Sequence, residues 1–174
     1  MAKVAWIGLG VMGYPMAGYL LTRGGHTAAV YNRTAAKAEA WVAAYGGGTC
    51  HATPAAAAAG ADFVFACVGN DDDLRQVCTA PEGAFAGMQA GAIFVDHTTV
   101  SAAVTRELSA LAGERGLGFV DAPVSGGVKR AVNGTLAILV GGAADLLARW
   151  RPVLEAMGTS VLHIGPAGSG HAAK

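Results

Sequence analysis

Three glycines near the N-terminus have the spacing that binds the phosphates of a dinucleotide. Gly8, Gly10 and Gly13 follow a short apolar run, Lys3-Val-Ala-Trp-Ile, and precede a segment with helical spacing. In a strand–turn–helix context such a turn allows a tight bend, close approach of backbone to pyrophosphate and close helix–strand packing. The helix start adds free N–H groups and the positive end of its dipole. We therefore predict a dinucleotide site here; the alternative is a glycine-rich turn that only packs tightly.

The end of the second predicted strand indicates which dinucleotide is preferred. An NAD site typically has an acidic residue about 20 positions after the glycine turn. Here that place holds Asn32, followed by Arg33 and Thr34. A guanidinium can bind a 2′-phosphate through two hydrogen bonds, whereas a carboxylate would repel it. We expect NADP to be preferred over NAD; the alternative is that Arg33 is a solvated residue and Thr34 only caps the next helix.

Two further segments carry groups suited to chemistry on a small carboxylate. Ser125-Gly126-Gly127 follows an apolar strand, and such a turn can present a hydroxyl and successive N–H groups to an anion. Lys174, one helical turn after His171, has the side chain of a general acid or base. Taken alone, each has an ordinary explanation, a glycine-rich turn and a solvated lysine. The remaining histidines lack partners at metal-ligand spacing, so no metal site is expected.

Alternating strand-like and helix-like runs must position these residues. Strands are predicted at 4–7, 28–31, 62–68, 92–96, 118–121, 136–140 and 160–164, and helices at 15–23, 35–45, 72–78, 102–115 and 143–157. Ala55-Ala59 is expected to be a short helix, and Thr34, Thr53 and Ser101 are expected N-caps. Alternation of this kind is typical of a doubly wound α/β domain with a mainly parallel sheet and helices on both faces.

Composition excludes several classes of protein. The 174 residues are 53% hydrophobic, and 12 basic residues balance 12 acidic ones. This balance gives no electrostatic basis for binding nucleic acid or a charged membrane surface. Three scattered cysteines favour reduced, mostly buried thiols. With no signal-peptide pattern or span-length apolar run, we expect a cytoplasmic protein.

Four blocks together resemble the β-hydroxyacid dehydrogenase family, which includes 3-hydroxyisobutyrate dehydrogenase and semialdehyde reductases and shares the NAD(P)-binding domain of 6-phosphogluconate dehydrogenase. They are Ile7-Gly-Leu-Gly-Val-Met-Gly-Tyr-Pro-Met-Ala17, Asp96-His-Thr-Thr99, Asp121-Ala-Pro-Val-Ser-Gly-Gly-Val128 through Gly134-Thr135-Leu136 to Gly141-Gly142, and Gly168-Ser-Gly-His-Ala-Ala-Lys174. The resemblance covers the whole chain. It implies a Rossmann-type domain at residues 1–164, with residues 165–174 beginning an interdomain helix that is cut short and the family's second, all-helical domain absent.

The resemblance also implies residue roles. The cofactor would be held by Gly8, Gly10, Val11, Met12, Gly13, Asn32, Arg33, Thr34, Val68, Gly69, Asp73 and Thr99. Ser125, Gly126 and Gly127 would cradle the substrate carboxylate, and Lys174 would be the catalytic lysine. Two residues depart from the family pattern: Tyr19 replaces a small polar residue, usually Asn, and Gly69 replaces a common Pro. The first is expected to shift local packing and the second to loosen its turn.

The implied activity is NADP-dependent oxidation or reduction of small β-hydroxy acids or their semialdehydes, with a homo-oligomer formed through the helical domain. We expect the 174 residues alone to be inactive. Two alternatives stay open: an NADP-binding module without turnover, and an imine-reducing relative, although such relatives often lack the lysine found at Lys174. The segment Gly134–Val140 departs from the pattern of 6-phosphogluconate dehydrogenase itself.

Overall fold

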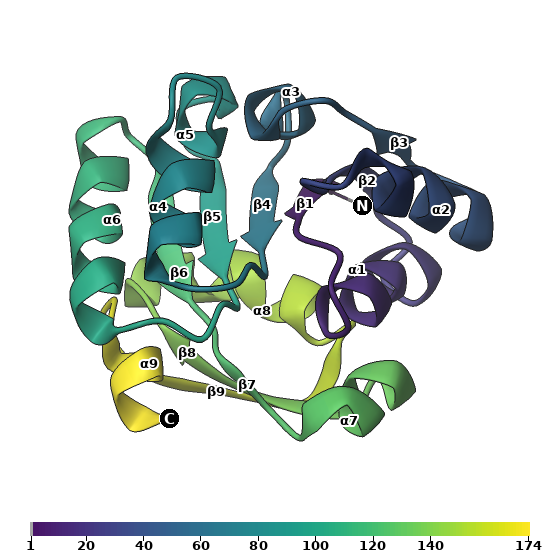
Figure 1. The fold of residues 1–174 in the computed structure, drawn as a ribbon. Coiled ribbons are helices and arrows are strands. Elements are labelled where there is room, and N and C mark those ends of the chain that lie inside the picture. Colours follow the sequence, from purple (N-terminus) through teal and green to yellow (C-terminus); the bar gives the residue numbers. More distant parts are fainter. Residues whose placement is uncertain (1) are drawn as a thin grey trace.

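A single twisted sheet covered by helices on both faces forms the framework of the protein (Figure 1). The computed structural model describes residues 2–174. Its strands are β1 (Lys3–Ile7), β2 (Thr27–Tyr31), β3 (Thr49–Cys50), β4 (Phe63–Ala66), β5 (Ile93–Asp96), β6 (Gly118–Asp121), β7 (Val124–Ser125), β8 (Leu136–Gly141) and β9 (Gly158–Gly165). Its helices are α1 (Gly13–Thr22), α2 (Ala35–Tyr45), α3 (Pro54–Ala58), α4 (Asp71–Thr79), α5 (Ala84–Gly87), α6 (Ala102–Glu114), α7 (Gly127–Asn133), α8 (Leu147–Leu154) and α9 (Ser169–Ala173).

The strand order confirms the predicted doubly wound α/β fold. Strands β3-β2-β1-β4-β5-β6 are parallel neighbours, so the direction of winding reverses between β1 and β4. Strand β8 is antiparallel to β6 and β7, and β9 pairs with its other edge in parallel. A parallel return needs a crossover of about a dozen residues or more. Helix α7 is too short for such a crossover, so the chain turns back and β8 runs antiparallel to β7.

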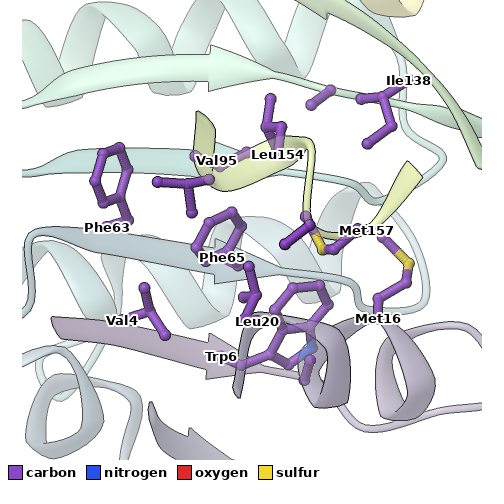
Figure 2. Packing of buried hydrophobic residues seen from close by; sticks show 14 of the residues in the cluster. Val4, Trp6, Met16, Leu20, Phe63, Phe65, Val95, Ile138, Leu154 and Met157 are labelled. Atoms are coloured by element: carbon purple, nitrogen blue, oxygen red, sulfur yellow. The ribbon is translucent and has the colours of Figure 1, made fainter. Parts of the chain in front are cut away.

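The alternation of side chains along the central strands builds two separate apolar layers. In β1, Val4 and Trp6 face one layer, shared with α1, α2 and α8, while Ala5 and Ile7 face the other, shared with α3 to α6. Figure 2 shows the first layer, in which Trp6 and Phe65 pack side by side. Strands buried on both faces have nearly continuous apolar sequences. This burial fixes their register and therefore where their carboxyl ends stand.

Most predicted elements are present, with differences at their ends. The predicted helix at 143–157 is shorter: a 3-10 turn at Ala144–Leu146 leads into α8, which ends at Leu154. The predicted short alanine helix is confirmed as α3. Strands β3 and β7 and helices α5 and α7 were not predicted. Each has between two and seven residues, too few for a periodicity to show in the sequence.

Two of the three predicted caps are confirmed. The Oγ1 of Thr53 accepts the N–H of Ala56, and the Oγ of Ser101 accepts the N–H of Val104. The prediction for Thr34 is wrong as regards its side chain, which makes no hydrogen bond to the start of α2 although the residue occupies the cap position.

Candidate functional site

The three glycines of the first turn differ in what surrounds them. Gly8 has φ +99°, a left-handed conformation, and a Cβ there would overlap the carbonyl oxygen of Cys67 at the end of β4. A Cβ on Gly13 would overlap the Gly8 carbonyl oxygen and lie 3.0 Å from Trp6 Nε1. A Cβ on Gly10 would meet no atom of the described residues within 4 Å. Gly8 and Gly13 therefore allow the turn and the tight packing of α1, whereas Gly10 leaves open space.

That open space is part of a cavity of about 590 Å³ at the carboxyl ends of β1, β2 and β4, where the direction of winding reverses. Ligands of open α/β sheets bind at such a position. Ten of the predicted cofactor residues line it: Gly8, Gly10, Val11, Met12, Gly13, Asn32, Arg33, Val68, Gly69 and Asp73. Thr34 and Thr99 are predicted cofactor residues that do not line it, and neither do Ser125, Gly126, Gly127 and Lys174.

The cavity offers hydrogen-bond donors to an anion. Within residues 2–174, no backbone hydrogen bond uses the N–H groups of Gly10, Val11 or Met12, which stand at the start of α1. Free N–H groups at a helix N-terminus favour negative charge. Because Gly10 lacks a side chain that would fill this cradle, the turn fits a pyrophosphate.

The end of β2 combines a structural amide with an unpaired cation. Asn32 Oδ1 accepts the N–H of Leu9 at 2.9 Å, and Asn32 Nδ2 donates to the Thr34 carbonyl at 3.0 Å. Asn32 thus joins the glycine turn to the segment after β2. The exposed Arg33 guanidinium lines the cavity and makes no hydrogen bond or ion pair with any residue from 2 to 174. It is free to bind an anionic group.

Sequence reasoning missed the opposite wall of the cavity. This wall is formed after β3 and in and after α4, by Ala52, Thr53, Pro54, Gln76, Val77, Ala80, Glu82 and Gly83. Also missed were Ile7, Tyr31 and Cys67, which line the cavity at the ends of β1, β2 and β4. Most belong to loops or very short elements, whose place against the glycine turn no local pattern reveals. Burial raises the pKa of the Cys67 thiol to about 12, so this cysteine is protonated and a poor nucleophile.

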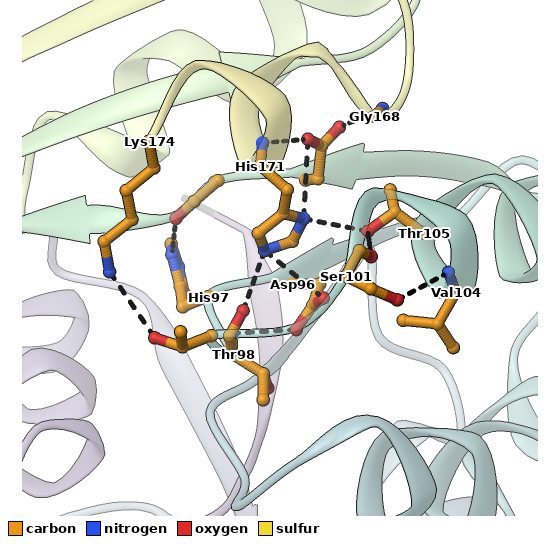
Figure 3. A network of polar contacts seen from close by, with 12 residues as sticks. Asp96, His97, Thr98, Ser101, Val104, Thr105, Gly168, His171 and Lys174 are labelled. Carbon is orange, nitrogen blue, oxygen red and sulfur yellow. Dashed lines mark hydrogen bonds and ion pairs between the residues drawn. The ribbon is translucent and has the colours of Figure 1, made fainter.

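Lys174 lies outside the cavity, beside the segment that follows β5 (Figure 3). Its Nζ donates to Thr99 Oγ1 at 3.4 Å. The neighbouring Thr98 accepts the N–H of Val68, a cavity residue, at 3.0 Å through its Oγ1. The short segment Thr98–Thr99 therefore touches both the cavity wall and Lys174.

Beneath Lys174 lies a buried polar network that the sequence did not predict. The carboxylate of Asp121 accepts the backbone N–H groups of Gly168 at 2.8 Å and His171 at 2.9 Å. The His171 ring lies 2.7 Å from the Thr98 carbonyl oxygen through Nε2 and 2.8 Å from Thr105 Oγ1 through Nδ1. Burial is the first cause that lowers the pKa of His171, which favours the neutral ring.

Two further ionisable groups of this network, Asp96 and His97, are fully buried. Burial raises the pKa of Asp96 to about 7, and its Oδ2 has no hydrogen-bond partner among residues 2–174. Burial lowers the pKa of His97 to about 4, and its ring stacks on Trp6 and Phe65. The structure thus places His97 in the core.

The predicted carboxylate cradle begins α7. Ser125 is exposed at the end of β7, and Gly126 and Gly127 have φ of +128° and +68°. A side chain on Gly126 would also meet that of Arg130. Within the chain from residue 2 onward, no hydrogen bond joins this turn to Lys174 or to the cavity. The structure thus brings ten cofactor candidates together and leaves the turn and Lys174 as separate groups.

Comparison with known proteins identifies relatives of the whole chain. Residues 3–165 match the model of the NAD binding domain of 6-phosphogluconate dehydrogenase. An uncharacterized oxidoreductase of Shewanella frigidimarina is 52% identical over 174 residues, 100% of this chain and 59% of that protein. The 2-(hydroxymethyl)glutarate dehydrogenase of Eubacterium barkeri is 38% identical over 172 residues, 99% of this chain and 56% of the enzyme.

A solved structure extends the similarity to the fold. The Mycobacterium tuberculosis 3-hydroxyisobutyrate dehydrogenase, solved with L-serine, superposes with a TM-score of 0.92 at 38% identity, over 99% of this chain and 57% of that one. The chain therefore spans between half and two thirds of the length of these relatives. From residue 2 to residue 174, no helix has both the length and the apolar character needed to cross a membrane.

Proposed function

Since the chain belongs to the family of the NAD(P)-binding domain of 6-phosphogluconate dehydrogenase and is an oxidoreductase domain of the 3-hydroxyisobutyrate dehydrogenase type, we propose that it binds NADP in preference to NAD. The protein that carries it would oxidise small β-hydroxy acids or reduce their semialdehydes. NADP would supply or accept the hydride when bound. The protein's own residues would bind the cofactor, orient the substrate and exchange the proton.

The observation that carries the cofactor proposal is the free cation of Arg33 on the cavity wall, next to Asn32, which stands where an NAD site has a carboxylate. The N–H groups of the Gly8–Gly13 turn would hold the pyrophosphate, with Val11 and Met12 beside it. Arg33 would hold the 2′-phosphate next to Asn32 and Thr34. The rest of the bound cofactor would be lined by Val68, Gly69, Asp73 and Thr99. Thr34 and Thr99 do not line the cavity, so the cofactor would have to extend past the cavity wall to contact them.

The proton would be exchanged at the Lys174 Nζ. An ammonium group can protonate a carbonyl oxygen in reduction, and the amine can accept the hydroxyl proton in oxidation. The Ser125-Gly126-Gly127 turn would bind the substrate carboxylate, so that a fixed anchor orients the reacting carbon. The presence of Lys174 favours a hydroxyl or carbonyl substrate over an imine.

Fluorescence titrations with NADPH and NADH test the cofactor preference. A charge-assisted hydrogen bond contributes about 1.5–3 kcal/mol, so one Arg33 contact gives NADPH an advantage of roughly 10- to 150-fold. We expect Arg33→Ala to abolish this advantage. Lys37→Ala is the matched control, because it removes an exposed cation of α2 that does not line the cavity. Equal affinities in the wild type, or a preference that survives in Arg33→Ala, refute the assignment.

Steady-state assays of the protein that carries this chain test the substrate class. The panel comprises small β-hydroxy acids, semialdehydes and a cyclic imine, each with its cofactor, for the wild type and Lys174→Met. We expect turnover with the first two and its loss in Lys174→Met at unchanged NADPH affinity. Turnover of the imine alone would support the imine-reducing alternative, and NADPH binding with no turnover would support a binding module.

A further inference from the structure

We propose that His171 and Asp121 are positioning residues that fix the place of the Lys174 amine by holding α9 against the carboxyl ends of β5 and β6. The proposal rests on the proposed function only for the chemical role of Lys174. The attachment of α9 follows from contacts within residues 2–174.

Helix α9 depends on the rest of the protein for its position. It contains only five residues, Ser169–Ala173, and isolated helices of this length do not form in water. Gly168 occupies the N-cap and has no side chain with which to cap the helix. The unsatisfied N–H groups of the first turn must therefore find acceptors elsewhere.

Asp121 supplies those acceptors from the end of β6. Its side chain is fully buried, and its two carboxylate oxygens accept the N–H groups of Gly168 and His171, at the cap and in the first turn of α9. The donors are 47 and 50 residues away in sequence. Hydrogen bonds to a buried carboxylate are stronger than those between neutral groups. Asp121 thus acts as a long-range N-cap for α9.

His171 makes the second attachment. The Thr98 carbonyl can only accept, so Nε2 of the His171 ring donates to it. In the neutral ring, Nδ1 accepts the hydroxyl hydrogen of Thr105, whose Oγ1 also lies 3.3 Å from the Ser101 carbonyl oxygen. This arrangement uses the neutral ring, which burial favours because it lowers the pKa of His171. It joins α9 both to the segment after β5 and to α6. The next turn of α9 carries Lys174 to the adjacent Thr99 (Figure 3).

Around the carboxylate of Asp121, the backbone of α9 packs directly against β6 and β8. A Cβ on Gly141 of β8 would overlap Asp121 Oδ1 and lie 2.8 Å from the backbone nitrogen of Gly170. A Cβ on Gly170 would lie 2.9 Å from the Asp121 carbonyl oxygen and 3.0 Å from that of Leu139. Two glycines therefore let the backbone of α9 approach β6 and β8 directly. Because the contact is this close, a displacement of the Asp121 carboxylate also displaces α9.

Three variants separate positioning from general stability. His171→Gln keeps an N–H donor for Thr98 and an oxygen acceptor for Thr105, so we expect nearly wild-type behaviour. His171→Leu removes both hydrogen bonds at similar volume. Thr105→Val removes one hydroxyl and serves where His171→Leu does not fold. Misplacement of a reacting group by about 1 Å can cost about 100-fold in rate. We expect a loss of this order in kcat for His171→Leu and a smaller loss for Thr105→Val, while NADPH affinity is unchanged.

The experiment combines kcat and NADPH affinity of the protein that carries this chain with amide hydrogen exchange of residues 168–174. Faster exchange there in His171→Leu and Thr105→Val, with protection restored in His171→Gln, supports the attachment. Equal exchange or equal kcat in the Leu and Gln variants overturns the proposal. Absence of turnover in the wild type refutes the proposed function instead, and the exchange data still decide whether His171 holds α9.

Discussion

Substituting alanine for Gly10 or for Gly13 should separate cofactor binding from folding stability. At Gly13 the new Cβ meets the Gly8 carbonyl oxygen and the buried Trp6 ring, whose Nε1 already donates to that oxygen at 2.8 Å. Overpacking of this kind costs about 1–3 kcal/mol, and a better helix propensity returns about 0.5–1 kcal/mol. We expect a net loss of about 1–2 kcal/mol, or roughly 2–8 °C in Tm.

At Gly10 the same methyl group should leave folding stability intact and lower the affinity for the cofactor. It meets no atom of residues 2–174 within 4 Å, and the backbone is not left-handed at Gly10. The free energy of unfolding should be unchanged or rise by up to about 1 kcal/mol, because the unfolded chain loses freedom. The methyl group does occupy the space next to the free N–H groups. Loss of one charge-assisted hydrogen bond lowers cofactor affinity at least about 10-fold.

Thermal unfolding without cofactor and fluorescence titration with NADPH measure the two effects on the same samples. Gly113→Ala is the control, since a Cβ on this exposed glycine of α6 also meets no atom of the part of the chain that the structure describes within 4 Å, and Gly113 lies outside the cavity. It should leave NADPH affinity unchanged. If Gly10→Ala binds NADPH as tightly as the wild type, or destabilises the protein as much as Gly13→Ala does, the division of roles within the turn is wrong.

Two further predictions concern stability. Because the pKa of Asp96 is raised to about 7, the folded protein keeps a proton that the unfolded chain releases above about pH 4, so Asp96 makes stability fall between these values. His97, with its pKa lowered to about 4, acts in the opposite direction up to about pH 6.5. In Asp96→Asn the unfolding free energy should therefore rise with pH relative to the wild type, by up to about 1.4 kcal/mol per pH unit; parallel curves in urea titrations from pH 4 to 7 would contradict this. Ser101→Ala should cost about 1 kcal/mol because its Oγ caps α6, whereas Thr34→Ala should change stability by less than about 0.5 kcal/mol. Equal losses in denaturant unfolding would show that the cap bonds are misassigned.

The features that the sequence predicts are local ones. The glycine spacing, the apolar runs of β1 and β4 and the serine cap of α6 each depend on a few consecutive residues, and all are present in the structure. The start of α7 was interpreted as a turn because it contains Gly126 and Gly127 and because the helix has only seven residues. The partners of Asp121 lie 47 and 50 residues further along the chain. Residue type alone does not reveal partners so far apart in sequence, so the buried network around Asp121 could not be predicted.

Tyr19 shows how a single departure from a family pattern acquires meaning only through the fold. From the sequence it was expected to shift local packing. In the structure its hydroxyl donates to the Val132 carbonyl, 113 residues away, and Arg23 lies over its ring at 4.3 Å while donating to the Gly134 carbonyl at 2.9 Å. The last carbonyls of a helix need such donors. Helix α1, which begins at the cavity, is therefore attached to the C-terminal end of α7, the helix that begins at Gly127. An Asn side chain at position 19 would be too short to reach the Val132 carbonyl, and it would offer no aromatic ring for Arg23 to pack on.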